Sequence, residues 1–269
     1  MRNKVNVLLR LMVILSLIFS QLTLISEARA QGAGVSLTLA ASNPNTYDHT
    51  VGGGQWNSGR KNIDILETLE GKDFACEDTV SYLMKVTAPN TTYLQSLGLM
   101  TLDMNFSITM DTTGQSGVAL GDPVTVGVNT GDPANINNGN SVASTVATSQ
   151  TGAMFTKGAL LLKTFRLTGV EAGETIIFRF NVKIHCQLGS RATGNLQVKF
   201  LSGDLATGVL SASPGAVEPI SGGNETVSLK SVEALAVPAI DIQKTPDSQS
   251  VVEGQQATFT ITVTNTGGS

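Results

Sequence analysis

The sequence has few of the residues that carry catalysis and cofactor binding. It contains two histidines, His49 and His185, and two cysteines. It has no His-x-x-x-His or Cys-x-x-Cys spacing, no Gly-x-Ser-x-Gly motif and no Gly-x-x-x-x-Gly-Lys motif. These absences argue against a zinc site, a hydrolase nucleophile and a phosphate-binding loop. We therefore expect no enzyme activity, no metal site and no cofactor.

Charged and aromatic residues are also scarce, at 14% and 5% of the chain. The net charge is −4, and lysines and arginines do not cluster. An acidic chain without basic clusters lacks the electrostatic footprint for nucleic acid or for an anionic membrane surface. Gly, Ser, Thr, Asn and Val are abundant instead, a composition that favours strands and turns over long helices.

The N-terminus has the pattern of a signal peptide. Arg2 and Lys4 precede an apolar run over residues 11–25, and small residues stand at Ala28 and Ala30. We predict a signal peptide at residues 1–30, since the run is too short to span a bilayer. A retained membrane anchor is the alternative. The prediction implies a secreted or cell-surface protein whose mature part makes no membrane contact.

Apolar and polar residues alternate along several segments. In residues 102–110 and 176–186 every second side chain is apolar, which places the apolar side chains on one face of a strand. The segment 62–71 reads equally well as a short helix. Further strands are predicted at residues 35–40, 79–87, 124–128, 160–167, 196–201 and 226–232. About eight half-buried strands predict an antiparallel β-sandwich, Ig-like or adhesin-like, over residues 31–235.

Cys76 and Cys186 fall on the inward-facing positions of their segments. Cys76 shares its face with Val80 and Tyr82, and Cys186 shares its face with Ile184. An exported chain meets an oxidising compartment, so we predict a disulfide between them that joins the two sheets. Two buried free thiols are the alternative. His185 points to the opposite face from Cys186, which argues against a Cys-His nucleophile pair.

The segment 52–61 holds Trp56, the one tryptophan, among polar and flexible residues. Trp56, with Arg60 nearby, is a candidate ligand contact, because an exposed indole stacks on sugars or on protein partners. The alternative is that Trp56 folds back and caps one end of the sandwich.

The loop 132–140 is rich in side-chain oxygens, which calcium binds. A plain turn built from Asn and Gly explains this loop better than calcium binding does.

Acidic residues are a final catalytic possibility, because glycoside hydrolysis uses a pair of carboxylates. Solvated charges at strand ends explain these residues more simply. They are Glu67, Glu70, Asp73, Glu77, Asp78, Asp103 and Asp111.

Three stretches near the C-terminus resemble a known family. They are residues 240–246 (IDIQKTP), 252–255 (VEGQ) and 259–267 (FTITVTNTG). Their early Lys, Gly-bearing turn and Thr-Asn-Thr-Gly strand end resemble the bacterial conserved-repeat surface domain, domain of unknown function 11. Phe259 stands where that family usually has Tyr. The resemblance implies an Ig-like β-sandwich that recurs in tandem in large secreted and envelope proteins.

An Ig-like domain needs about 100 residues and seven strands. We therefore expect residues 236–269 to be a linker and the first strands of a truncated repeat, and the chain to be an N-terminal fragment of a longer protein. The leading hypothesis is a non-catalytic structural or adhesive surface protein with other surface proteins or glycans as partners. The alternative is a secreted carbohydrate-binding module of a larger extracellular enzyme.

Overall fold

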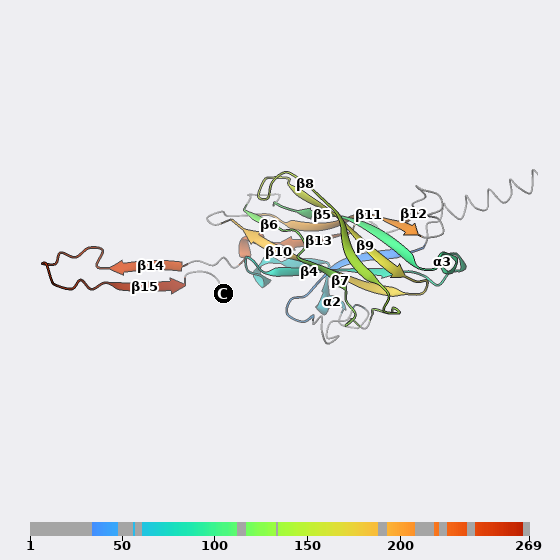
Figure 1. Cartoon of the computed structure of the whole chain (residues 1–269), viewed down its shortest axis with the longest axis horizontal. Coiled ribbons are helices and arrows are strands. Elements are labelled where there is room, and N and C mark those ends of the chain that lie inside the picture. Colours follow the sequence, from blue (N-terminus) through green and yellow to red (C-terminus); the bar gives the residue numbers. More distant parts are fainter. Residues whose placement is uncertain are drawn as a thin grey trace, which may run out of the picture.

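The chain folds into two antiparallel β-sheets packed face to face, followed by a separate hairpin (Figure 1). The structure is a computed structural model that describes residues 34–47, 56, 61–111, 117–132, 134–187, 193–207, 218–220, 225–235 and 240–265. The predicted signal peptide, His49 and Arg60 lie outside these residues. Among the described residues, no helix has both the length and the apolar character of a membrane span.

The six-stranded sheet has the order β2-β1-β4-β10-β6, and β7 also pairs with β10. Its strands are β1 (Ser36–Ser42), β2 (Ile65–Leu66), β4 (Thr79–Thr87), β6 (Val118–Leu120), β7 (Thr125–Val128) and β10 (Thr175–Cys186).

The seven-stranded sheet has the order β3-β13-β11-β5-β9-β8, and β12 also pairs with β11. Its strands are β3 (Thr68–Glu70), β5 (Met100–Thr109), β8 (Val142–Thr151), β9 (Leu160–Val170), β11 (Leu196–Thr207), β12 (Glu218–Ile220) and β13 (Thr226–Lys230). The β3–β13 pair is parallel.

Among the described residues the helices are short: α2 (Lys61–Asp64), α3 (Thr92–Leu97) and two 3₁₀ turns at Gly71–Asp73 and Val232–Ala234. The Thr91 hydroxyl begins α3 by accepting a hydrogen bond from the Leu94 N–H at 3.2 Å, as an N-cap residue does.

The core between the sheets is built from the inward faces of both. Phe106 of β5 packs against Phe165 of β9, with ring centroids 5.4 Å apart. Across the sandwich, Phe165 lies 4.8 Å from Phe180 of β10, and Tyr82 of β4 stacks on Phe180 at 5.5 Å. These rings are completely buried, so aromatic contacts bridge the two sheets as well as neighbours within each sheet.

The alternation in the sequence predicts most of the strands correctly. The all-β, antiparallel sandwich is confirmed, and β4 has the predicted bounds. Two details differ. The segment 62–71 is the end of α2, then β2 and β3, and then the start of a 3₁₀ turn, rather than one helix. The alternation in residues 176–186 predicts that the other face of this strand, which includes Ile177, is exposed to solvent. In the structure that face of β10 is partly buried, since Ile177 is fully buried.

An ion pair lies between the two sheets, near the edge of the seven-stranded sheet that β9 and the end strand β8 form. The Lys163 side chain is on the inward face of β9 and only 5% exposed, and it pairs with Asp122 of the β6–β7 connection. It also donates a hydrogen bond to the Thr148 hydroxyl of β8 at 2.7 Å. The pairing compensates the cost of keeping an ammonium group out of water.

The strands β14 (Ile240–Thr245) and β15 (Thr260–Asn265) pair with each other in a two-stranded sheet. Their register places Ile242 opposite Val263 and Lys244 opposite Ile261. This face of the hairpin is apolar but exposed, since Ile242 and Val263 are 66% and 63% accessible to solvent. The hairpin therefore has an apolar face that no described residue covers.

Candidate functional site

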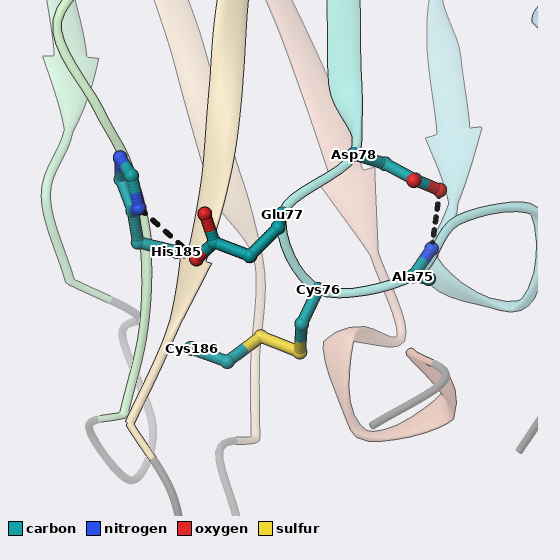
Figure 2. Close-up of a disulfide and its surroundings, with 6 residues drawn as sticks. All are labelled: Ala75, Cys76, Glu77, Asp78, His185 and Cys186. Atoms are coloured by element: carbon teal, nitrogen blue, oxygen red, sulfur yellow. Dashed lines mark hydrogen bonds and ion pairs between the residues drawn. A yellow bond between two sulfur atoms is a disulfide. The ribbon is translucent and has the colours of Figure 1, made fainter. Parts of the chain in front are cut away.

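Cys76 and Cys186 form the expected disulfide, with Cα atoms 5.6 Å apart (Figure 2). The prediction that it joins the two sheets is wrong. Cys186 ends β10, and Cys76 lies in the turn before β4, the neighbour of β10 in the six-stranded sheet. Cys186 packs against the core and Cys76 is buried. The β4–β10 register places Lys183 opposite Thr79, and its continuation brings Cys186 opposite Cys76. The bridge therefore locks one strand pair.

A polar group lies beside the disulfide on the outer side of β10. Glu77 accepts from the Lys183 ammonium at 2.7 Å. The other oxygen of Glu77 lies 3.2 Å from Nδ1 of His185 (Figure 2). The hydrogen bond from Lys183 lowers the pKa of Glu77, and His185 adds to this effect. His185 thus contacts a carboxylate while Cys186 is in a disulfide, which agrees with the expectation that the two residues do not form a nucleophile pair.

Trp56 lies on the outer face of the six-stranded sheet. Its side chain is 1% exposed and belongs to a second, smaller apolar cluster. The sheet contributes Ala40, Leu83 and Ile177, which come from three adjacent strands. The Lys85 ammonium lies 5.5 Å from the centre of the indole ring, within range of a cation–π contact.

The structure therefore corrects the prediction of a ligand contact through an exposed Trp56. The Trp56 side chain is buried, as the alternative prediction expected. It covers the outer face of the six-stranded sheet, however, and not an end of the sandwich. The physical reason is that Leu83 and Ile177 give this face apolar side chains that a large ring can cover. A pocket of about 240 Å³ beside it is lined by Thr38, Trp56, Leu66 and Glu67 among others.

A buried hydrogen-bonded network holds the same covering layer. The Tyr47 hydroxyl donates to Asp132 at 2.7 Å and accepts from the Asn129 amide at 2.6 Å. The other Asp132 oxygen accepts from the Ala134 N–H at 2.8 Å. Burial, and then the bond to Asp132, raise the pKa of Tyr47 far above its usual value. Both carboxylate oxygens of Asp132 thus accept hydrogen bonds from protein donors.

Two buried tyrosines give a matched test of this network. We expect Tyr47→Phe to lower the free energy of unfolding by about 1 to 3 kcal/mol, because it leaves Asp132 and Asn129 with unmet hydrogen bonds. Tyr82→Phe should instead raise it by about 1 kcal/mol, because the buried Tyr82 hydroxyl has no hydrogen-bond partner among the described residues. Urea unfolding of both variants measures the difference. Equal losses in the two variants would contradict the role given to the network.

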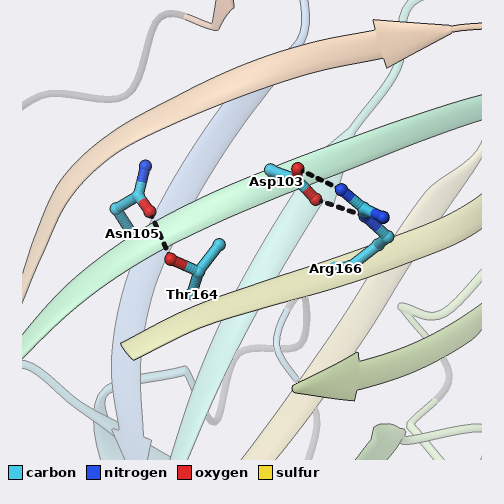
Figure 3. Close-up of polar contacts among 4 residues, drawn as sticks. All are labelled: Asp103, Asn105, Thr164 and Arg166. Atoms are coloured by element: carbon cyan, nitrogen blue, oxygen red, sulfur yellow. Dashed lines mark hydrogen bonds and ion pairs between the residues drawn. The ribbon is translucent and has the colours of Figure 1, made fainter. Parts of the chain in front are cut away.

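The outer face of the seven-stranded sheet is polar, and its side chains bond to each other (Figure 3). Arg166 of β9 makes two hydrogen bonds to Asp103 of β5, at 2.7 and 2.6 Å. Asn105 accepts from the Thr164 hydroxyl at 2.7 Å and donates to the Ser202 hydroxyl at 3.0 Å. The contacts run across β11, β5 and β9, which are adjacent strands, so this half-exposed face is held in one arrangement.

The acidic residues considered for catalysis are used in different ways. Asp103 pairs with Arg166 on the outer face of the seven-stranded sheet, and Glu77 pairs with Lys183 beside the disulfide. Asp78 accepts from the Ala75 N–H in the turn before β4. Among the described residues, no group of three or more His, Cys, Asp or Glu side chains has the proximity that a metal ion requires.

These features define an all-β protein with two antiparallel sheets, one disulfide and a small covering layer around Trp56. No protein-family model matches the chain, and no curated protein matches it either. Among solved structures, it is similar to the cohesin module of a family 33 glycoside hydrolase from Clostridium perfringens. That match has 7% sequence identity and a TM-score of 0.32, and it covers 61% of this chain and 89% of the module.

A second similar structure is the sixth cohesin of scaffoldin B from Acetivibrio cellulolyticus, in a complex with a Cel5 dockerin mutant. It has 12% identity and a TM-score of 0.30 over 61% of this chain and 94% of that chain. At such low scores, the sandwich assignment rests on the strand pairing and the shared core described above.

Proposed function

We propose that this chain is a non-catalytic, extracellular structural or adhesive protein that works by contact with another surface protein. The observation that carries the proposal is the outer face of the seven-stranded sheet. Three adjacent strands present polar side chains there, and hydrogen bonds such as those of Asp103 with Arg166 hold them in place. A face ordered before binding loses less conformational entropy when a partner docks.

Secretion supports the same proposal. The signal-peptide pattern at residues 1–30 agrees with the disulfide, because disulfides persist in oxidising compartments outside the cytoplasm. The Trp56 indole is buried, so the carbohydrate-binding alternative lacks the exposed ring on which it depended. Contact with protein through the polar sheet face is therefore the better proposal.

The hairpin extends the proposal to the architecture of the protein. Its exposed apolar face includes Ile240, Ile242, Ile261 and Val263, each more than 60% accessible. Two strands with an apolar face are marginally stable alone and need further strands or a helix to cover that face. We propose that β14 and β15 begin an Ig-like repeat of the type that this segment resembles, within a longer surface protein.

The test is surface proteolysis of intact producing cells, followed by detection with an antibody against the sandwich. The proposal predicts a species much larger than the 269-residue chain that is removed from the cell surface by protease. A species of the size of this chain, found free in the medium, would contradict the surface architecture.

Contact through the polar face is tested separately on purified protein. The double variant Asp103→Ala, Arg166→Ala should no longer adhere to cells that carry the partner surface protein. Its melting temperature should change little, since both side chains are partly exposed. Thr226→Ala on β13 is the control, because Thr226 is exposed and lies on a strand outside the three that make these contacts. Adhesion that survives the double substitution would place the contact elsewhere.

A further inference from the structure

The strand β8 ends the seven-stranded sheet and is exposed on both of its faces. It pairs with β9 on one side. Of its ten residues only Ala143 is half-buried, and the others are exposed. Within the described part of the chain, β8 makes no backbone hydrogen bond to any strand other than β9. The strand β7 lies against β8 but pairs with β10, and its four residues are too few to cover the edge.

This edge lacks most of the features that normally prevent strand pairing between molecules. Proteins usually protect edge strands with lysine, proline, inward-pointing charge, β-bulges or short length. The β8 sequence, VASTVATSQT, has neither a charged residue nor a proline. Its one irregularity is a bulge at Val146, where the register with β9 shifts between Thr145 and Ala147. Residues 147–151 beyond the bulge form a regular stretch.

The other described edges of the two large sheets are short or covered. The end strands β2, β3, β6 and β7 have two to four residues each. Where β1 extends beyond β2, the Glu225 carboxylate accepts a hydrogen bond from the Leu39 N–H and so occupies that edge. Among the described strands of the sandwich, β8 is therefore the long edge that remains open. The hairpin strands β14 and β15 also have open edges, of six residues each.

Charge indicates which partner fits this edge. The chain has a net charge of −4, so two copies repel each other on average. The β8 edge is uncharged over ten residues, so two copies can approach there without opposing like charges. An antiparallel pair of identical strands is also related by a two-fold axis, and such a contact closes after two molecules.

We propose that two copies of this chain associate edge to edge through β8, with residues 147–151 paired antiparallel about Ser149. In this register Ala147 of one copy faces Thr151 of the other, and Thr148 faces Gln150. All of these side chains are small or polar, and cross-strand Ser and Thr pairs form hydrogen bonds. The contact joins two seven-stranded sheets into one continuous sheet. Its small size predicts a weak, concentration-dependent dimer.

Sedimentation velocity of the secreted chain, over a wide range of concentration, measures the association. We expect Ser149→Glu to weaken it about tenfold or more, because two carboxylates then face each other across the two-fold axis. The control is Thr226→Glu, which adds the same charge to an exposed position of β13, a strand inside the sheet. It should leave the association nearly unchanged.

A cross-linking variant tests the register. Ser149→Cys should form a covalent dimer under mild oxidation, because directly opposed residues of an antiparallel pair are close enough for a disulfide. Thr226→Cys should not. A chain that stays monomeric at every concentration overturns the proposal. So does a dimer that Ser149→Glu leaves intact, and in that case Ile242→Lys tests whether the apolar face of the hairpin holds it.

Discussion

Replacement of both Cys76 and Cys186 with serine is expected to lower the free energy of unfolding by about 4 to 5 kcal/mol. The disulfide joins residues 110 positions apart, and a cross-link over so long a loop removes many conformations from the unfolded chain. Cys76 is buried and Cys186 packs against the core, so the serine hydroxyls add a desolvation cost to the loss. Urea unfolding of the secreted chain, under non-reducing conditions, measures the difference.

The native protein in the presence of a reductant provides the control, since reduction of the disulfide should reproduce most of the loss without a substitution. Thiol alkylation of denatured, unreduced protein supplies an independent check. Two alkylated cysteines per chain would show that the bridge is absent and would contradict the prediction. If the native protein does contain the bridge, but the double serine variant loses less than about 1 kcal/mol of its free energy of unfolding, the cross-link has little effect on the entropy of the unfolded chain.

Substitution of Trp56 with alanine is expected to lower the free energy of unfolding by about 3 to 5 kcal/mol. The indole is buried against Leu83 and Ile177, and its removal leaves a cavity over the outer face of the six-stranded sheet. The Lys85 ammonium would lose its ring contact as well. Trp56→Phe should cost less, because it keeps part of the buried apolar surface.

Tyr93→Ala gives a matched control, because Tyr93 is an aromatic residue of α3 that is 37% exposed. Its loss should stay below about 1 kcal/mol. Trp56 is also the one tryptophan of the chain, so intrinsic fluorescence reports on this site alone. We expect a blue-shifted emission that acrylamide quenches poorly. Emission typical of an indole in water, together with a small loss of stability, would contradict the burial of Trp56.

Alternation of apolar and polar residues was sufficient to predict the strands that face the core. The strands β4, β5 and β10 carry long, regular alternation, and each is observed near its predicted bounds. The strand β8 escaped prediction for a physical reason. Both of its faces are exposed, so nothing in its sequence distinguishes one face from the other.

The same limit explains the errors around the candidate sites. Period-two alternation placed Cys76 and Cys186 on inward faces but contained no information on which strands are neighbours, so the bridge was assigned to the wrong strand pair. The alternation predicted that Ile177 faces solvent. That prediction failed because the residues that cover Ile177, which are Tyr47, Trp56 and Ala134, come from segments far away in the sequence. Burial of Trp56 depends on that layer as well.

The sequence by itself determined the strand-forming segments, their inward faces and the expected pairing of its two cysteines, because these properties depend on the periodicity and composition of short segments. Only the tertiary structure decided the neighbours of each strand, the covering of one sheet by Trp56 and the open edge at β8. Strand order is set by contacts between distant segments, which no local pattern of a single strand encodes.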